Sequence, residues 1–110
     1  MALPQQAQRR PRVNALSQFH YINHAGSEMV VYRVTPPEAE SGVLVGEHEY
    51  RGFPATGAGI KTDDTSLRVA FFALSWDQDV KTPIRLFARD ELGNEGIAGF
   101  DYRVFPKDFR

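Results

Sequence analysis

Residues 84–105, IRLFARDELGNEGIAGFDYRVF, have the pattern of two β-strands joined by a turn. Apolar side chains alternate along both arms, and those that share one face are Ile84, Leu86 and Ala88 before the turn and Ala98, Phe100, Tyr102 and Val104 after it. A period of two is typical of strands with one buried face. Gly93 and Asn94 tolerate the positive φ that such a turn needs. The stretch therefore predicts a half-buried hairpin that closes a β-sandwich.

The rest of the chain consists of short apolar runs that end at turn residues. Residues 28–35 are the clearest strand, because Val30, Tyr32 and Val34 face one way and Pro36 then ends the ladder. Further strands are expected at residues 13–21, 42–51 and 67–76, the second of these as two short strands or one bulged strand. We expect an all-β fold, an immunoglobulin-like β-sandwich of about seven strands.

Length and composition predict one globular domain. The chain has 110 residues, of which 42% are hydrophobic and 25% are charged, and an immunoglobulin-type sandwich has about 100 residues. Residues 1–11 are polar, contain Pro4 and Pro11, and are rich in arginine, so we interpret them as a linker. The sandwich domain is expected to occupy residues 12–110.

The run at residues 67–76 is apolar on both faces, so its periodicity does not distinguish a buried strand from a helix, and its length, aromatic residues and flanking turns favour a strand. We place Val69, Phe71 and Ala73 in the core. The opposite face then carries Phe72, Leu74 and Trp76. Such a face needs cover, and one hypothesis is a docked partner domain, which makes these side chains a possible docking or stacking surface. The other is that loop residues such as Phe53 or Phe109 cover them within the domain.

The charge balance and the residue types exclude several classes of function. Thirteen Lys and Arg residues against fourteen Asp and Glu give a formal net charge of -1, which offers no field for steering nucleic acid. With no cysteine, the chain has neither a disulfide nor a thiol nucleophile. No apolar segment approaches the ~18 residues of a membrane span, and the N-terminus lacks the apolar core of a signal peptide. We expect any export signal to lie outside this fragment.

Histidines are the first candidates for metal ligands. His20 and His24 stand four residues apart, which would place both over one metal on a helix but separates them by ~13 Å on an extended chain. His48 stands between Glu47 and Glu49. We interpret all three as polar residues at strand ends, with a shared zinc or nickel site as the alternative.

Acidic residues offer a second candidate site. Asp77, Asp79 and Asp90 are expected in loops at strand ends, where the turns of a sandwich can assemble a calcium site. Calcium needs six to eight oxygen ligands, so these residues supply only part of one. Ordinary solvated turn acids are the alternative interpretation. No carboxylate pair or serine motif predicts a catalytic residue.

Four blocks of sequence together resemble a known family. They are Phe19 to Asn23, Gly26 to Val34, Gly52 to Pro54, and Leu86 to Asp90 continued by Tyr102 to Lys107. As a set they resemble the immunoglobulin-like region that precedes the catalytic domain in certain lysostaphin-type (LytM-like) zinc peptidoglycan endopeptidases of Gram-negative bacteria. The resemblance covers roughly residues 12–110. It implies an accessory domain in the periplasm or cell envelope that positions, shields or regulates a metallopeptidase.

The zinc-binding elements of that family's peptidase domain, His-x-x-x-Asp and His-x-His, do not occur in these residues. His20 is followed four residues later by His24, and His48 two residues later by Tyr50. The resemblance thus implies that this fragment is not an enzyme and holds no cofactor. Zinc is expected in the catalytic domain of the parent chain, a metalloendopeptidase that cleaves peptidoglycan.

Two functions of different classes remain open. In the first, a non-catalytic sandwich docks on the neighbouring peptidase domain or on another envelope protein. In the second, the domain is a glycan-binding module of the cell envelope, with Trp76, Tyr50 and Phe53 as a stacking platform for peptidoglycan. Aromatic residues at strand spacing lie more often in the core, which favours the first.

Overall fold

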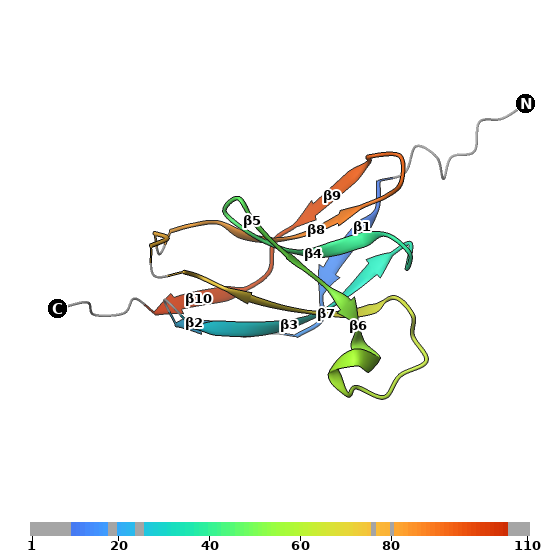
Figure 1. Cartoon of the computed structure of the whole chain (residues 1–110), viewed down its shortest axis with the longest axis horizontal. Helices are drawn as coiled ribbons and strands as arrows, with labels where there is room; N and C mark the ends of the chain where they lie inside the picture. The colour runs from blue at the N-terminus through green and yellow to red at the C-terminus, as the bar shows by residue number, and fades with distance from the viewer. Residues whose placement is uncertain (1–9, 18–19, 24–25, 76, 80, 106–110) are drawn as a thin grey trace, which may run out of the picture.

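The computed structural model describes residues 10–17, 20–23, 26–75, 77–79 and 81–105. Ten strands lie in this part of the chain. The first sheet has the order β1-β3-β7-β6 and consists of β1 (Arg12–Ala15), β3 (Ser27–Thr35), β7 (Leu67–Ala73) and β6 (Phe53–Pro54). The second has the order β5-β4-β8-β9 and consists of β5 (His48–Arg51), β4 (Glu40–Val45), β8 (Ile84–Arg89) and β9 (Glu95–Ala98). Figure 1 shows the two sheets as facing layers. The predicted all-β sandwich is confirmed.

Two further features connect the layers. A parallel pair, β2 (His20–Asn23) with β10 (Tyr102–Phe105), joins segments from near the two ends of the chain. The segment from β5 to β6 passes from one layer to the other through Gly52, as Figure 1 shows, and continues into the 3-10 helix η2 (Ala55–Ala58). No helix in the described ranges is long and apolar enough to cross a membrane.

The core lies between the sheets and follows the alternation of the strands. Along β3 the predicted inward residues Val30, Tyr32 and Val34 are fully buried, as expected from the sequence. The facing strands contribute Val43 and Val45 from β4 and Leu86 from β8. Because every second side chain of these strands enters one apolar layer, the two sheets bury their inner faces against each other.

The closing hairpin is confirmed in its first half and wrong in its second. β8 and β9 pair antiparallel around residues 90–94, with Arg89 opposite Glu95. After Ala98 the chain leaves this ladder, and β10 pairs instead with β2. Tyr102 still packs against the core, as the alternation predicted. Alternation reports which side of the chain faces the core, and it does not identify the partner strand.

The expected single strand at residues 13–21 is also divided. β1 belongs to the first sheet and β2 pairs with β10, with a bend at Ser17 between them. The Ser17 hydroxyl accepts a hydrogen bond from the Val31 backbone N–H at 3.0 Å, and this bond holds the bend against β3. The alternative of two short strands at residues 42–51 is the observed one, with Gly46 at a φ of 62° in the turn.

Candidate functional site

The three aspartates of the predicted calcium site do not come together. Asp77 and Asp79 precede β8 and Asp90 follows it, so a six-residue strand of about 20 Å separates them. Asp79 accepts a hydrogen bond from the Lys81 backbone N–H at 2.7 Å. Within the described residues, no three His, Cys, Asp or Glu side chains are grouped so that they can hold a metal ion. The described residues therefore do not bring Asp77, Asp79 and Asp90 together, and a calcium site at these residues has no support in the structure.

Asp90 has a structural role instead. Its carboxylate accepts hydrogen bonds from the backbone N–H groups of Leu92 and Asn94, both at 2.9 Å, and from the Asn94 side chain at 3.0 Å. The side-chain hydrogen bond from Asn94, with these backbone bonds, lowers the pKa of Asp90. Gly93 adopts a φ of 85° in the same turn. Asp90 thus shapes the β8–β9 turn, as an Asx residue does.

The histidines divide between described and undescribed parts of the chain. His48 begins β5 and is exposed. His20 lies in β2, but its side chain and the whole of His24 are outside the described residues. The interpretation of these two as polar residues at strand ends stays a prediction.

The faces of β7 are the reverse of those expected. Phe72 and Leu74 are 1% and 0% exposed and belong to the core, whereas Phe71 is 51% exposed. Trp76 lies outside the described residues. The physical reason is that β7 is covered on both sides at Val69, which lies opposite Phe53 of β6 and is buried although it points away from the core. β7 is therefore apolar on its outer face at Val69 as well as on its core face, and Phe72 and Leu74 do not form a docking surface.

A different exposed apolar surface occurs on the outside of the first sheet. Met29 of β3 lies directly opposite Phe71 of β7, and Met29 is 37% exposed. Phe53 stacks on Phe71 with 5.8 Å between ring centroids. Leu16, 38% exposed, donates its backbone N–H to Val31, which lies two residues from Met29 on the same face. We call Leu16, Met29 and Phe71 the outer apolar face. The parity of β3 alone predicts Met29 there, because Val30 and Tyr32 face inward.

The outer surface of the second sheet is different in character. Arg89 forms ion pairs with Glu40, Glu49 and Glu95 at 3.1 to 3.3 Å. Its guanidinium carbon lies 4.8 Å from the centroid of the Phe87 ring, which is fully buried. This network covers the aromatic ring with charge, so the two outer surfaces of the sandwich are not equivalent.

Tyr50 is not part of a stacking platform. It packs against the core, and its hydroxyl donates a hydrogen bond to the Ala73 carbonyl at 3.2 Å. This bond ties β5 of the second sheet to β7 of the first. Of the other two residues of the predicted platform, Phe53 is half-buried against Phe71, and Trp76 lies outside the described residues.

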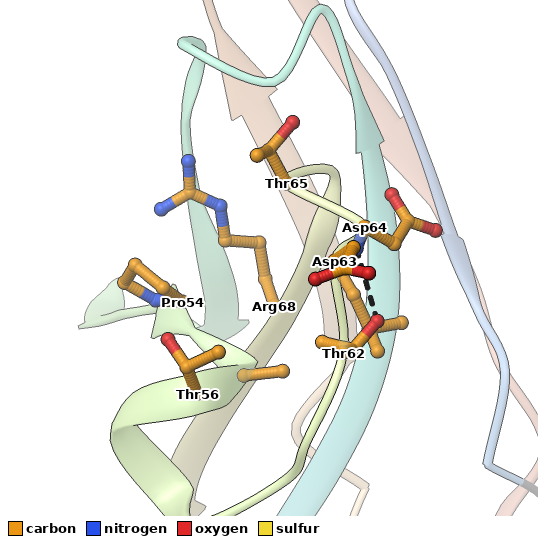
Figure 2. Close-up of a pocket in the computed structure, with 9 residues that line it drawn as sticks. Pro54, Thr56, Thr62, Asp63, Asp64, Thr65 and Arg68 are labelled. Atoms are coloured by element: carbon orange, nitrogen blue, oxygen red, sulfur yellow. Dashed lines mark hydrogen bonds between the residues drawn. The ribbon is translucent and has the colours of Figure 1, made fainter.

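A hollow of about 200 Å³ lies beside the start of β7. It is lined by Pro54, Ala55, Thr56, Thr62, Asp63, Asp64, Thr65, Leu67 and Arg68. Figure 2 shows Arg68 between Pro54 on one side and Asp63 and Thr62 on the other. β6, η2 and the loop before β7 thus each form one wall of the hollow. The sequence signal for this hollow was weak, because it depends on β6 pairing with β7 through only two residues.

Asp64 holds the loop of the hollow in place. Its carboxylate accepts hydrogen bonds from Arg33 of β3 at 2.7 Å and from the Ser66 backbone N–H at 2.9 Å. Hydrogen bonds from the Ser66 hydroxyl and from Arg33 lower the pKa of Asp64 from 3.8 to about 2. The Asp64 backbone N–H in turn donates to the Thr62 hydroxyl at 3.0 Å. These hydrogen bonds therefore hold the loop against the outer side of β3.

Comparison with known proteins adds no assignment: no protein-family model matches the chain, and no curated protein matches it. Two features stand out, the outer apolar face and the Arg68 hollow.

Proposed function

We propose that this chain is a non-catalytic, immunoglobulin-like accessory domain that docks through its outer apolar face. The observation that carries the proposal is the cluster of Leu16, Met29 and Phe71, exposed by 38, 37 and 51%, on one side of a sheet. Isolated apolar residues are normal on a protein surface, whereas a contiguous patch marks an interaction site. We propose the neighbouring zinc peptidase domain of the same parent chain as the partner.

The size of the patch favours a tethered partner over a free one. Three side chains exposed by a third to a half amount to a few hundred Å² at most. A stable complex between free proteins buries about 800 Å² on each partner. A domain on the same polypeptide needs less surface, because the tether supplies an effective concentration in the millimolar range. The patch is therefore matched to a neighbouring domain of the same chain.

The grouping of strands supports the immunoglobulin-like part of the proposal. In that fold strands A, B, E and D form one sheet and C, F and G the other. Here the strands in the corresponding chain order are β1, β3, β7 and β6 in the first sheet and β4, β8 and β9 in the second. The lysostaphin-type parent, its zinc and its location in the periplasm or cell envelope rest on the resemblance of the four sequence blocks.

Hydrogen exchange tests the docking. We expect the amides of β3 and β7 to exchange more slowly in the parent chain than in the isolated domain. Phe71→Ser should remove this extra protection, since it replaces the most exposed ring of the face with a polar group. Ile97→Ser is the matched control, because Ile97 is 44% exposed on the outside of the second sheet. Equal exchange in the parent and in the isolated domain would overturn the proposal.

Peptidoglycan hydrolysis tests the parent's activity separately. With added zinc, we expect the parent chain to cleave purified sacculi and the 110-residue chain to be inactive. Hydrolysis by the 110-residue chain would contradict the accessory role. Binding of this chain to sacculi that is lost in Phe71→Ser, with the fold intact, would favour the alternative of a glycan-binding module that uses the stacked Phe53 and Phe71 rings.

A further inference from the structure

The outer apolar face contains an oxidisable sulfur atom. The chain has no cysteine and two methionines, Met1 and Met29. Met1 lies outside the described residues, whereas Met29 is 37% exposed on β3. Peroxides convert the sulfur of an accessible methionine to a sulfoxide. In the part of the chain that the structure describes, the sulfur open to oxidation therefore lies in the face that we propose as the docking surface.

Met29 lies among apolar side chains within this face. It stands directly opposite Phe71 in the antiparallel ladder, and the Phe71 ring stacks on that of Phe53 at 5.8 Å between centroids. Leu16 continues the face and is 38% exposed. None of these three neighbours has a side-chain hydrogen-bond donor. A polar group at the end of Met29 would therefore find no partner in these side chains.

We propose that Met29 is an oxidation site that controls docking of the neighbouring domain, an inference that rests on the proposed function. Hydrogen peroxide is the oxidant. The Met29 sulfur attacks one peroxide oxygen and forms an S–O bond, while the O–O bond breaks. The proton of the transferred oxygen passes to the other oxygen, which leaves as water. The sulfur loses two electrons, the peroxide gains them, and the side chain becomes a sulfoxide.

The sulfoxide opposes docking because its oxygen is polar and accepts hydrogen bonds. In the docked state this oxygen would be buried among apolar side chains, and a buried acceptor without a donor weakens the contact. We expect oxidation to shift the docking equilibrium at least about tenfold toward the undocked state. The sulfur is accessible only while the face is open, so oxidation also holds the domain in that state.

Peroxide treatment of the 110-residue chain is the first test. Mass spectrometry of its peptides should show one added oxygen atom at Met29. The urea midpoint should not change, because this side chain lies outside the core. If Met29 stays unmodified under conditions that oxidise a free methionine peptide, the proposal is wrong, whatever the outcome for docking.

Hydrogen exchange in the parent chain is the second test. Before treatment, slower exchange of β3 and β7 than in the isolated domain reports docking, and after treatment these amides should lose most of this extra protection. Extra protection that persists after Met29 is oxidised would overturn this inference and leave the docking proposal intact. No extra protection before treatment would overturn the docking proposal, and this inference with it.

A variant that moves the methionine away from the face provides the control. Met29→Leu combined with Leu92→Met keeps the number of methionines and places one of them at the β8–β9 turn, where Leu92 is 71% exposed. Peroxide should oxidise position 92 without changing the exchange of β3 and β7. The variant is compared with itself before and after treatment, so its own docking strength does not enter the comparison. Loss of protection in this variant would show that another site responds to peroxide, and the proposal would be wrong.

Discussion

Gly52 is the residue at which the chain passes from the second sheet to the first, and it lies against the side chain of Tyr32. A Cβ atom at this position would overlap the Tyr32 hydroxyl oxygen. The Tyr32 ring is fully buried, and its hydroxyl is hydrogen bonded to the Ser41 hydroxyl at 2.7 Å. Burial raises the pKa of this phenol. Because the ring is buried and its hydroxyl is bonded to Ser41, the absence of a side chain at Gly52 is a packing requirement.

Gly52→Ala should therefore lower the free energy of unfolding by about 1–3 kcal/mol, the usual cost of overpacking a core. Urea unfolding measures the loss. Gly99→Ala is the control, because no atom lies within 4 Å of a Cβ there. Adding Tyr32→Phe to Gly52→Ala should recover part of the loss, since the hydroxyl is the nearest atom. Equal stability of the two alanine variants would contradict this account of Gly52.

Asp64 makes the stability of the domain depend on pH in the acid range. Its pKa is about 2 in the folded chain against 3.8 for the free group, because Ser66 and Arg33 donate hydrogen bonds to the ionised carboxylate. A lowered folded-state pKa stabilises the fold above the unfolded pKa. This contribution is thus present above about pH 4 and is lost as the pH falls from about 4 to 2.

The prediction is that Asp64→Asn flattens the decrease of the urea midpoint between pH 4 and pH 2. Asp64 is exposed, so the surrounding solvent and salt reduce the effect, and high salt should reduce it further. Asp101→Asn is the control, because it makes the same change at another surface aspartate and should leave the decrease of the midpoint as it is in the parent chain. A midpoint profile for Asp64→Asn that superimposes on the parent profile would show that the Arg33–Asp64–Ser66 contacts add nothing to stability.

At the scale of the element, β7 has two neighbouring phenylalanines with opposite environments. Phe72 is 1% exposed and makes an edge contact with Phe100 at 6.0 Å, whereas Phe71 is 51% exposed. We expect Phe72→Ala to cost about 3–5 kcal/mol and Phe71→Ala less than about 1 kcal/mol. Urea unfolding of the two variants provides the comparison. A larger loss of unfolding free energy for Phe71→Ala than for Phe72→Ala would mean that Phe71 faces the core, as the sequence analysis expected.

β7 also illustrates what alternation can and cannot predict. In β3 the exposed Arg33 marks the outer side, and the inward positions of Val30 and Tyr32 followed correctly. In β7 the one charged residue, Arg68, has the parity of the buried Ala70 and Phe72, and on the other side Val69 is buried beside Phe53 of β6, so polar residues do not mark the outer side. Its orientation depends on a pairing between residues far apart in the sequence. The alternation of residues within one strand does not show which distant segment pairs with it.

The same limit applies to the partners of strands and to the candidate sites. The turn at Asp90 to Asn94 was recognisable because its residues act locally. The exit of β10 from the hairpin was not, since its partner β2 lies 82 residues earlier, with Tyr102 opposite His20. The Arg68 hollow likewise combines β6, a loop and β7. Features made by contacts within a few residues were predictable, and features made by long-range pairing were not.

At the scale of the whole molecule, the β2–β10 pair joins segments near the two ends of the chain. In this pair Val104 lies opposite Ile22, which is 1% exposed. The Tyr102 hydroxyl accepts a hydrogen bond from the Ile84 backbone N–H at 3.2 Å, and its ring lies 5.4 Å from that of Phe100. β10 therefore covers one end of the core and connects β2 to the second sheet.

Removal of β10 should consequently affect the whole fold. We expect a chain that ends at Asp101 to lose more than about 4 kcal/mol, a large part of the 5–15 kcal/mol that stabilises a typical domain. A chain that ends at Phe105 is the matched control and should keep a cooperative urea transition. A chain that begins at Arg10 should also keep it, because residues 1–9 are predicted to be linker. A cooperative transition in the chain ending at Asp101, at an unchanged midpoint, would mean that the sandwich closes without β10.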